Sequence, residues 1–441
     1  MIALHPFRFI HAADLHLDTP FTGMTGIPDQ LRSYLQDSTF AALSGLVDLA
    51  VSEQVDFIVI SGDVYDAADS SLRAQLRLKE AWERLDRHGI PVYVIHGNHD
   101  PLGSRVRLAV PSNVRIYGSS LESYTAVSRL NGQPVAVVSG ISYASSSVTE
   151  NLSRYFIRSE DSSLYHIALL HANVDGQEGH DAYAPCSLSE LRESGYDYWA
   201  LGHIHKRQVL SEAPWVVYPG NPQGRSMKET GAKGCYLVEV DEAGRSVLHF
   251  HELDQVRWCE IELSIEGLNT EEEWKLRTEE RLEAIRQDLK GKPAIARFKY
   301  TGSGPLHTLI SSGREARELL AELQRQEEIR VGAGSTGLLP RGIVWPAGIR
   351  LHTQAAVDRE QLLGEDSFLG ELFRMAEQAE REPQLLDELL EAALEPMKSD
   401  RRLRQLLKSK NAQERLEWLH FARETAASLL REEGAAGEGG R

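Results

Sequence analysis

Residues 1 to about 250 alternate short β-rich runs with longer amphipathic segments, and this alternation limits the folds open to the chain. The expected strands are Phe7–His11, Val55–Ser61, Pro91–His96, Val135–Gly140, His166–Leu170 and Tyr198–Leu201. Helical leucine spacing marks the segments Leu31–Glu53 and Ser71–His88 between the first three strands. Strands that alternate with helices predict βαβ units, with buried sheet and helices outside. Because the later strands follow one another more closely, we expect antiparallel pairs in the second half.

Side chains that bind metals follow these strands at five places. They are Asp14 and His16, Asp63 and Asp66, Asn98 with His99 and Asp100, His171, and His203 with His205. In an open α/β sheet, ligands bind beyond the carboxyl ends of the strands, so the five places can converge on one site. Carboxylate, amide and imidazole donors without thiolates suit Mn²⁺, Fe²⁺ or Zn²⁺. Two metals need a bridging carboxylate, and Asp63 is the candidate for that position.

The spacing within these places fits a metal centre. In Asp14-x-His16 and His203-x-His205, alternate residues of an extended segment point the same way, so each pair can face one metal. Three glycines precede ligands, at Gly62, Gly97 and Gly202. We expect them to let the chain turn sharply as it leaves a strand. One Asp-x-His pair is ordinary in loops, but an ordered set of five after five strands predicts metal binding.

The order of the motifs along the chain, DxH, GDxxD, GNHD, H and GHxH, resembles that of the calcineurin-like metallophosphoesterases. The segments that carry the resemblance are IHAADLHLDTPF, VISGDVYD, VIHGNHD, ALGHIHK and YPGNPQGRSMKETGAKGCYLVEV. They are most similar to the DNA-repair exonuclease branch, with its SbcD-type nuclease subunit and YhaO-like subgroup. The resemblance covers residues 7–255 well, and residues 256–350 look like the family's capping domain. It implies an α/β sandwich of mixed β-sheets flanked by helices, with a small α/β capping domain and a helical C-terminal segment.

The resemblance also implies roles for individual residues. One metal would be held by Asp14, His16, Asp63 and His205, and the other by Asp63, Asn98, His171 and His203. His99 would touch the scissile phosphate and assist departure of the leaving oxygen, and Asp100 would orient His99. Asp66 stands where some nuclease relatives have a histidine, so it either supports a ligand from behind or contacts DNA. Mn²⁺ is the expected metal, with Fe²⁺ and Zn²⁺ as alternatives.

Beyond residue 255 the character of the sequence changes twice. Strands are expected at Trp258–Ile265 and Pro293–Tyr300, and helices at Thr270–Leu289 and Arg314–Gln326. From about residue 358 the sequence is helical, and its Gly/Glu-rich end is typical of disorder. We therefore expect a nuclease domain at 1–255, an α/β capping and DNA-binding domain at 256–355, a helical partner-binding segment at 356–433 and a disordered tail at 434–441.

The net charge is 48 − 65 = −17, which argues against a protein that coats nucleic acid with its whole surface. Basic residues nevertheless gather in the loops after GNHD and GHIH. The candidate contacts to DNA phosphates are Arg105, Arg107, Lys206, Arg207, Arg225 and Lys228. Ordinary solvated loop charge is the alternative for each of them.

These observations favour a two-metal phosphodiester hydrolase. The resemblance implies a Mn²⁺-dependent DNA exonuclease in double-strand break repair, with endonuclease activity on hairpins or single strands as a further expectation. In SbcD-like nucleases a C-terminal helical segment docks on a separate SMC-like ATPase, here of the SbcC/YhaN type. The chain has no GxxxxGKS/T phosphate loop of its own, so an ATPase must be a partner. The helices could instead pack on their own domain. Relatives form homodimers, and we expect the same here.

Two other functions stay open. One is a phosphodiesterase or phosphatase for a small nucleotide or lipid headgroup, although a capping module and helical tail favour a macromolecular substrate. The other is a non-catalytic scaffold, which the complete ligand set disfavours. The chain lacks a signal-peptide pattern and an apolar run near the roughly 20 residues of a membrane span. Its cysteines, Cys186, Cys235 and Cys259, form no CxxC pair. We therefore expect a cytoplasmic, nucleoid-associated protein without membrane contact.

Overall fold

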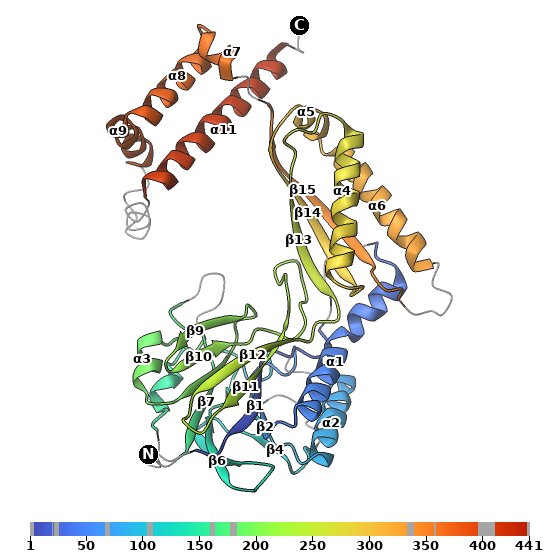
Figure 1. Cartoon of the computed structure of the whole chain (residues 1–441), viewed down its shortest axis with the longest axis vertical. Helices are drawn as coiled ribbons and strands as arrows, with labels where there is room; N and C mark the ends of the chain where they lie inside the picture. The colour runs from blue at the N-terminus through green and yellow to red at the C-terminus, as the bar shows by residue number, and fades with distance from the viewer. Residues whose placement is uncertain are drawn as a thin grey trace. The chain divides into compact units, whose positions relative to one another are not determined.

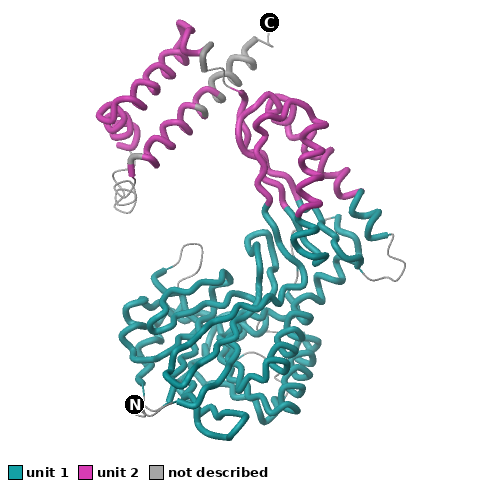
Figure 2. The backbone as a smooth tube through the Cα atoms, in the orientation of Figure 1, with its two compact units in different colours: residues 1–260, 285–296, 326–347 teal, residues 261–284, 297–325, 348–441 magenta. Residues whose placement is uncertain are grey.

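The chain divides into two compact units (Figure 2). Unit 1 comprises residues 1–260, 285–296 and 326–347, and unit 2 comprises residues 261–284, 297–325 and 348–441. The structure is a computed structural model, and it describes residues 4–19, 21, 26–66, 71–103, 109–158, 164–176, 183–332, 339–356, 359–395 and 411–438.

Unit 1 contains two six-stranded mixed sheets (Figure 1). The first has, in spatial order, β12 (Ser246–Glu252), β11 (Gly234–Val240), β1 (Phe7–Ala12), β2 (Phe57–Ser61), β3 (Val92–Ile95) and β4 (Val114–Ile116). The strands β1 to β4 run parallel, whereas β11 is antiparallel to both of its neighbours. The helices α1 (Asp29–Ser52) and α2 (Leu72–Arg87) pack against this sheet.

Helix α2 shows why this part of the sequence is helical. Ser71 caps its N-terminus, because the hydroxyl accepts a hydrogen bond from the Ala74 amide at 3.0 Å. Leu78, Trp82 and Leu85 recur at helical spacing, and all three are buried in the core that α1 and α2 share with β1, β2 and β3. The parallel strands are therefore covered on this face, as βαβ units require.

The second sheet faces the first across an aromatic core. Its strands, in spatial order, are β5 (Glu122–Val127), β6 (Pro134–Gly140), β7 (Tyr165–His171), β8 (Tyr198–Gly202), β10 (Trp215–Tyr218) and β9 (Gln208–Glu212). Phe9 of the first sheet stacks on Phe57 and meets the edge of Tyr198 from the second, each with ring centroids 5.3 Å apart. The short helices η1 (Leu152–Tyr155) and α3 (Leu188–Glu193) cover the outer face.

The predicted fold class, a sandwich of mixed sheets flanked by helices, is confirmed. The six expected strands correspond to β1, β2, β3, β6, β7 and β8. Antiparallel pairs occur in the later part, as expected, at β5–β6, β9–β10 and β11–β12. The strands that the sequence did not reveal, β4, β5, β9, β10, β11 and β12, are mostly short or half exposed. Exposed polar residues interrupt the apolar run in β5, β9 and β12. The strands β10 and β11 are apolar and buried, so this reason does not apply to them.

The third sheet has three strands, and each strand begins in residues of unit 1 and continues in unit 2. They are β13 (Arg257–Ser264), β14 (Ala294–Ser303) and β15 (Val344–Gln354). The accompanying helices are α4 (Glu271–Asp288), α5 (Leu306–Ile310) and α6 (Arg314–Gly332). Only β15 and α5 were not expected.

The C-terminal part of unit 2 is helical, as predicted. Its helices are α7 (Arg359–Gly364), α8 (Phe368–Arg381), α9 (Pro383–Leu394) and α11 (Ala412–Glu438). Helix α11 runs past Gly434, where we expected a disordered tail to begin, and residues 439–441 lie outside the described residues. The prediction of disorder from Gly434 onward is therefore wrong for the residues up to Glu438. Among the described helices, none has the length and apolar character of a membrane span.

Candidate metal centre

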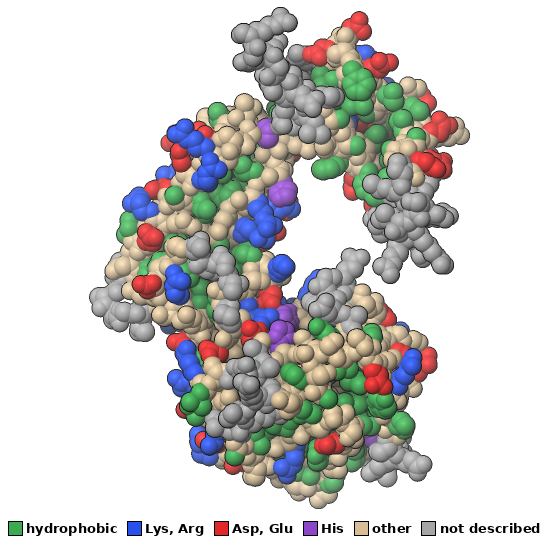
Figure 3. Space-filling model, turned by 180° about the vertical axis from the view of Figure 1, so that it is seen from behind, with side chains coloured by type: hydrophobic (Ala, Val, Ile, Leu, Met, Phe, Trp, Pro, Cys, Tyr) green, Lys and Arg blue, Asp and Glu red, His purple; other side chains and the backbone are tan. Residues whose placement is uncertain are grey.

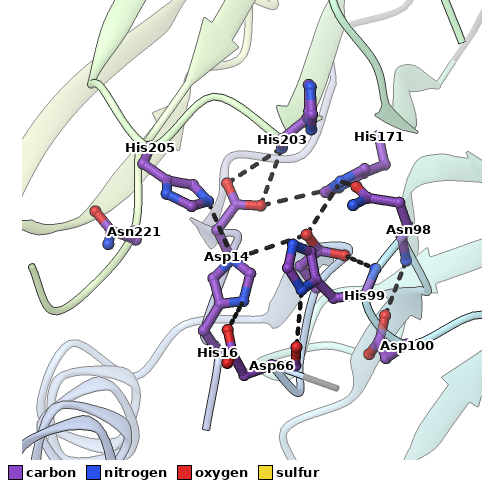
Figure 4. Close-up of polar contacts among 12 residues, drawn as sticks. Asp14, His16, Asp66, Asn98, His99, Asp100, His171, His203, His205 and Asn221 are labelled. Carbon is purple, nitrogen blue, oxygen red and sulfur yellow. Dashed lines mark hydrogen bonds and ion pairs between the residues drawn. The ribbon is translucent and has the colours of Figure 1, made fainter. Parts of the chain in front are cut away.

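The predicted ligands meet where five strands end. Asp14 and Asp63 follow the neighbouring strands β1 and β2, and Asn98 follows β3. His171 closes β7 and His203 follows β8, which is its neighbour in the second sheet. In Figure 4 the side chains of Asp14, His16, His171 and His205 point toward one another. The carboxyl ends of both sheets therefore supply one site.

Asp14, His16 and His205 form the first group that could hold a metal ion. The Nε2 atoms of His16 and His205 lie only 3.0 Å apart. His205 directs its Nδ1 to the Glu229 carboxylate at 2.7 Å, so this Nδ1 carries the hydrogen and Nε2 carries a lone pair. A cation between the two rings would satisfy both Nε2 atoms. This donor set therefore fits a divalent metal.

Asp14, Asp63 and His171 form the second group. His171 donates its Nδ1 hydrogen to the Ser61 carbonyl at 3.0 Å, which leaves Nε2 as the ligand atom. That Nε2 lies 3.4 Å from Asp63 Oδ2 and 3.0 Å from Asn98 Oδ1. Asp63 also belongs to a group with His16 and His99. The structure thus brings Asp63 between the two halves of the site, where a bridging carboxylate is needed.

His203 takes part in the site through its backbone. Its amide donates to both carboxylate oxygens of Asp14, at 3.0 and 3.2 Å. Its ring lies edge-on to the ring of His171, with centroids 5.3 Å apart, and extends away from Asp14 in Figure 4. Among the described residues, the ring of His203 belongs to none of the three groups that could hold a metal. Its role as a ligand stays a prediction.

His99 and Asp100 have different partners from those expected. The His99 ring donates from Nδ1 to the backbone carbonyl of Asp66 at 2.8 Å, and its amide donates to Asp63 Oδ1 at 3.0 Å. Asp100 accepts from His96 Nδ1 at 2.9 Å and from the Val64 amide at 3.0 Å. No contact between Asp100 and His99 is found among the described residues, so Asp100 does not orient the His99 ring directly. It instead ties the GNHD turn to the loop after β2.

The buried titratable groups of the site shift one another's pKa values. Burial alone would raise the pKa of Asp63, but the charges of His171 and His16 outweigh it and hold this pKa far below its ordinary range. Burial lowers the pKa of His171, but Asp63 and Asp14 outweigh it and raise this pKa to about 9. For His16, burial and the charge of Arg225 lower the pKa to about 3. Because metals bind neutral imidazole, loading the centre would displace a proton from His171.

The backbone of the site is strained. Four ligand candidates without glycine's freedom have positive φ: Asp14 (53°), His16 (41°), Asp63 (48°) and His203 (96°). The left-handed region crowds Cβ and is costly for residues other than glycine. Five other described residues besides glycines also have positive φ, so four of the nine belong to this site.

The expected turning role of the glycines holds only for Gly62, whose φ is 95°. Gly97 and Gly202 are not in that region. They are needed for close approach, since a Cβ on Gly97 would meet Asp63 and a Cβ on Gly202 would meet the Ser61 carbonyl.

Comparison with known proteins agrees with this geometry. Residues 7–207 match the family model of the calcineurin-like phosphoesterases, and residues 258–354 match the middle domain of the metallophosphoesterase YhaO. The metallophosphoesterase YhaO of Bacillus subtilis is 39% identical over 373 residues, which cover 84% of this chain and 87% of YhaO. The chain belongs to the calcineurin-like metallophosphoesterases. It is therefore a hydrolase of phosphoester bonds, as the family name states.

Two more distant relatives of this metallophosphoesterase are a DNA-repair protein and a nuclease component by name. The DNA double-strand break repair protein Mre11 of Saccharolobus solfataricus is 28% identical over 53% of this chain and 61% of its own length. A component of the nuclease SbcCD from Bacillus subtilis is 24% identical over 58% of this chain and 70% of its own length.

The predicted DNA-contacting residues of this metallophosphoesterase separate into three kinds. Arg105 and Arg107 lie outside the described residues. Lys206, Arg207 and Lys228 are exposed, and the Arg207 guanidinium lies 3.8 Å from the centroid of the Phe250 ring. Figure 3 shows His side chains at the surface with acidic and basic side chains around them.

Arg225 differs from these exposed basic residues. Its side chain is only 15% exposed and lies 2.5 Å from Asp66 Oδ1, so it is part of the metallophosphoesterase site. Its role as a DNA contact stays a prediction.

Sequence reasoning missed Glu229, which lies beside His205. A carboxylate at this distance along the chain forms no motif with a histidine, so only the folded loop after β10 reveals the pair.

Proposed function

We propose that the protein is a Mn²⁺-dependent DNA exonuclease of double-strand break repair, with endonuclease activity on hairpins or single strands. The observation that carries the proposal is the convergence of Asp14, Asp63, His16, His171 and His205 beside the half-buried His99. The matches to Mre11 and to the SbcCD nuclease support DNA as the substrate. The proposed organisation is that predicted from the sequence: nuclease domain, capping domain and helical partner-binding segment.

The residues of the site would hold two metal ions. Asp14, His16, Asp63 and His205 would hold one, and Asp63, Asn98, His171 and His203 the other. When bound, such ions activate water and neutralise charge on a phosphoryl group. Asp63 and Asp14 favour divalent ions over monovalent ones, because two buried carboxylates need compensating charge.

His99 is the proposed general acid. The Asp66 carbonyl can only accept, so His99 Nδ1 carries a hydrogen and Nε2 is the atom that exchanges a proton. The His99 ring is held edge-on to His16, with centroids 4.8 Å apart, so it lies at the metal site. From there Nε2 would protonate the leaving oxygen of the phosphodiester, a step typically worth about 10²–10⁴-fold.

The proposed partners are an SMC-like ATPase and a second copy of the chain. Phe368, Met375 and Phe421 of the C-terminal helices are 72%, 43% and 68% exposed, so large apolar groups are available to a partner helix. On α2, Leu72 and Leu76 are 64% and 45% exposed and would face the second copy.

The proposed contacts to the DNA backbone are made by Lys206, Arg207 and Lys228. We expect DNA binding to be weak, sensitive to salt and dependent on metal.

The test is incubation of the pure protein with Mn²⁺ and end-labelled duplex, single-stranded and hairpin DNA, with bis-p-nitrophenyl phosphate alongside. We expect stepwise shortening of labelled DNA that requires Mn²⁺ and is absent from an Asp63→Ala control. Hydrolysis of the small ester without cleavage of any DNA, with or without the ATPase partner, would favour the small-molecule phosphodiesterase instead. Tight DNA binding without metal would also contradict the proposal.

A further inference from the structure

A half-buried carboxylate, that of Glu229, contacts the His205 ring at Nδ1. Glu229 Oε1 lies 2.7 Å from His205 Nδ1, and the Glu229 side chain is only 12% exposed. Its other oxygen accepts from the Arg225 amide at 2.7 Å and from Asn221 Nδ2 at 2.9 Å. Glu229 is therefore fixed on several sides, and it fixes His205 in turn.

A second carboxylate lies behind the His16 ring. Asp66 Oδ1 faces His16 Nδ1 at 3.2 Å, at an angle outside that of a well-aligned hydrogen bond. The Arg225 guanidinium joins the two carboxylates, since Nη1 lies 2.5 Å from Asp66 Oδ1 and Nη2 lies 3.5 Å from Glu229 Oε1. Arg225 Nη2 also lies 3.3 Å from His205 Nδ1.

We propose that Glu229 and Asp66, linked by Arg225, are positioning residues that hold His205 and His16 with both Nε2 atoms toward one metal. The proposal rests on the metal centre of the proposed function and deepens it, because it gives Glu229 a task that no motif gives it and favours one of the two roles left open for Asp66.

The physical reason lies in the two nitrogens of each ring. A carboxylate at Nδ1 fixes the hydrogen there, keeps the lone pair on Nε2 and makes Nε2 a stronger donor to a cation. Without Glu229, the His205 ring can rotate or carry its hydrogen on Nε2, where it would repel a metal. Arg225 limits the movement of both carboxylates at once, because its planar guanidinium can bind two acceptors.

The other half of the site is built differently. His171 Nδ1 is held by the Ser61 carbonyl rather than by a carboxylate. Loss of Glu229 should therefore weaken one metal and spare the other. A merely structural role for Glu229, as a staple of its loop, would instead lower stability and leave both metal affinities alone or weaken them together.

The test is titration of full-length, metal-free protein with Co²⁺, followed by visible absorption, and with Mn²⁺, followed by calorimetry. For Glu229→Gln we expect one of two metals to bind about 10–100-fold more weakly, with the other within twofold of the unchanged protein. Arg225→Lys should weaken binding of the same metal by a smaller factor. Glu212→Gln, an exposed glutamate on β9, is the matched control and should change neither affinity.

Two results would overturn the proposal. One is a folded Glu229→Gln protein in which both affinities stay within twofold, and the other is equal weakening of both metals together with a lower melting temperature. A double-mutant cycle adds a second test. In a His205→Ala background, Glu229→Gln should weaken metal binding by less than a further twofold, because its effect passes through His205. A further tenfold loss of metal affinity would contradict positioning through His205. Because metal titration uses no substrate, it tests this inference separately from the proposed nuclease activity. If the protein without substitutions bound two metals but cleaved no DNA, the proposed function would be wrong and this inference would still hold.

Discussion

The loops of the metal centre in unit 1 and the C-terminal helices with β15 in unit 2 use their residues in opposite ways. Around the centre, a Cβ on Gly202 would run into the Ser61 carbonyl, and Asp14 and Asp63 accept a strained backbone. In unit 2, a Cβ on Gly348 meets nothing within 4 Å, and Phe421 stays 68% exposed. The first region is packed to hold a few polar atoms still, and the second leaves apolar surface open.

The largest effect should follow from Asp63→Ala. Because Asp63 stands in two of the groups that could hold a metal, its loss should empty the centre and lower hydrolysis of bis-p-nitrophenyl phosphate by more than about 10⁴-fold. Metal content by mass spectrometry and ester hydrolysis would be measured together. Asp366→Ala, an exposed aspartate of unit 2, is the control. Retention of two metals by the Asp63→Ala protein would contradict the bridging role.

His99→Ala should separate chemistry from metal binding. With the general acid gone, we expect two bound metals but about 10²–10⁴-fold slower phosphodiester hydrolysis. The matched change is His352→Ala, an exposed histidine on β15. If the cleanly metallated His99→Ala protein were fully active, His99 would have no part in the mechanism.

Gly202→Ala against Gly348→Ala compares the packing of the two regions directly. The new methyl group at residue 202 would press on the Ser61 backbone and on His171 Nδ1 at 2.9 Å, so the free energy of unfolding should fall by about 1–3 kcal/mol. At residue 348 there is open space, and alanine should be neutral or stabilise by up to about 1 kcal/mol. Thermal unfolding of both variants measures the change in stability. Equal changes in melting temperature would contradict the difference in packing between the two regions.

The smallest effect on catalysis should come from the C-terminal helices. Phe368→Ser and Phe421→Ser should each weaken binding of the candidate SMC-like ATPase by about tenfold, with ester hydrolysis unchanged. Leu130→Ser alters an apolar residue of unit 1 that is 92% exposed and serves as control. Calorimetry would measure the affinity for the ATPase. If neither substitution changed that affinity, the helices would pack on their own domain and not bind the partner.

The sequence predicted the parts of the centre that depend on strand ends. Asp14, Asp63 and Asn98 each follow an apolar run, and neighbouring parallel strands bring such positions together wherever the sheet forms. The partner of Asp100 could not be predicted, because it depends on the side to which the GNHD turn directs each side chain. Glu229 and Arg225 reach His205 and Asp66 only through the path of the loop between β10 and β11. Half-exposed strands such as β12 were missed since their alternation resembles that of polar loops.

The positive φ angles of Asp14, His16, Asp63 and His203 have a consequence for the life of the protein without metal. Each such residue costs of order 1–3 kcal/mol, a sum comparable with the whole stability of many domains. Metal that binds only the folded chain repays this strain by mass action. Protein without metal should therefore be less stable as well as inactive, and proteases should degrade it faster than the metal-bound form.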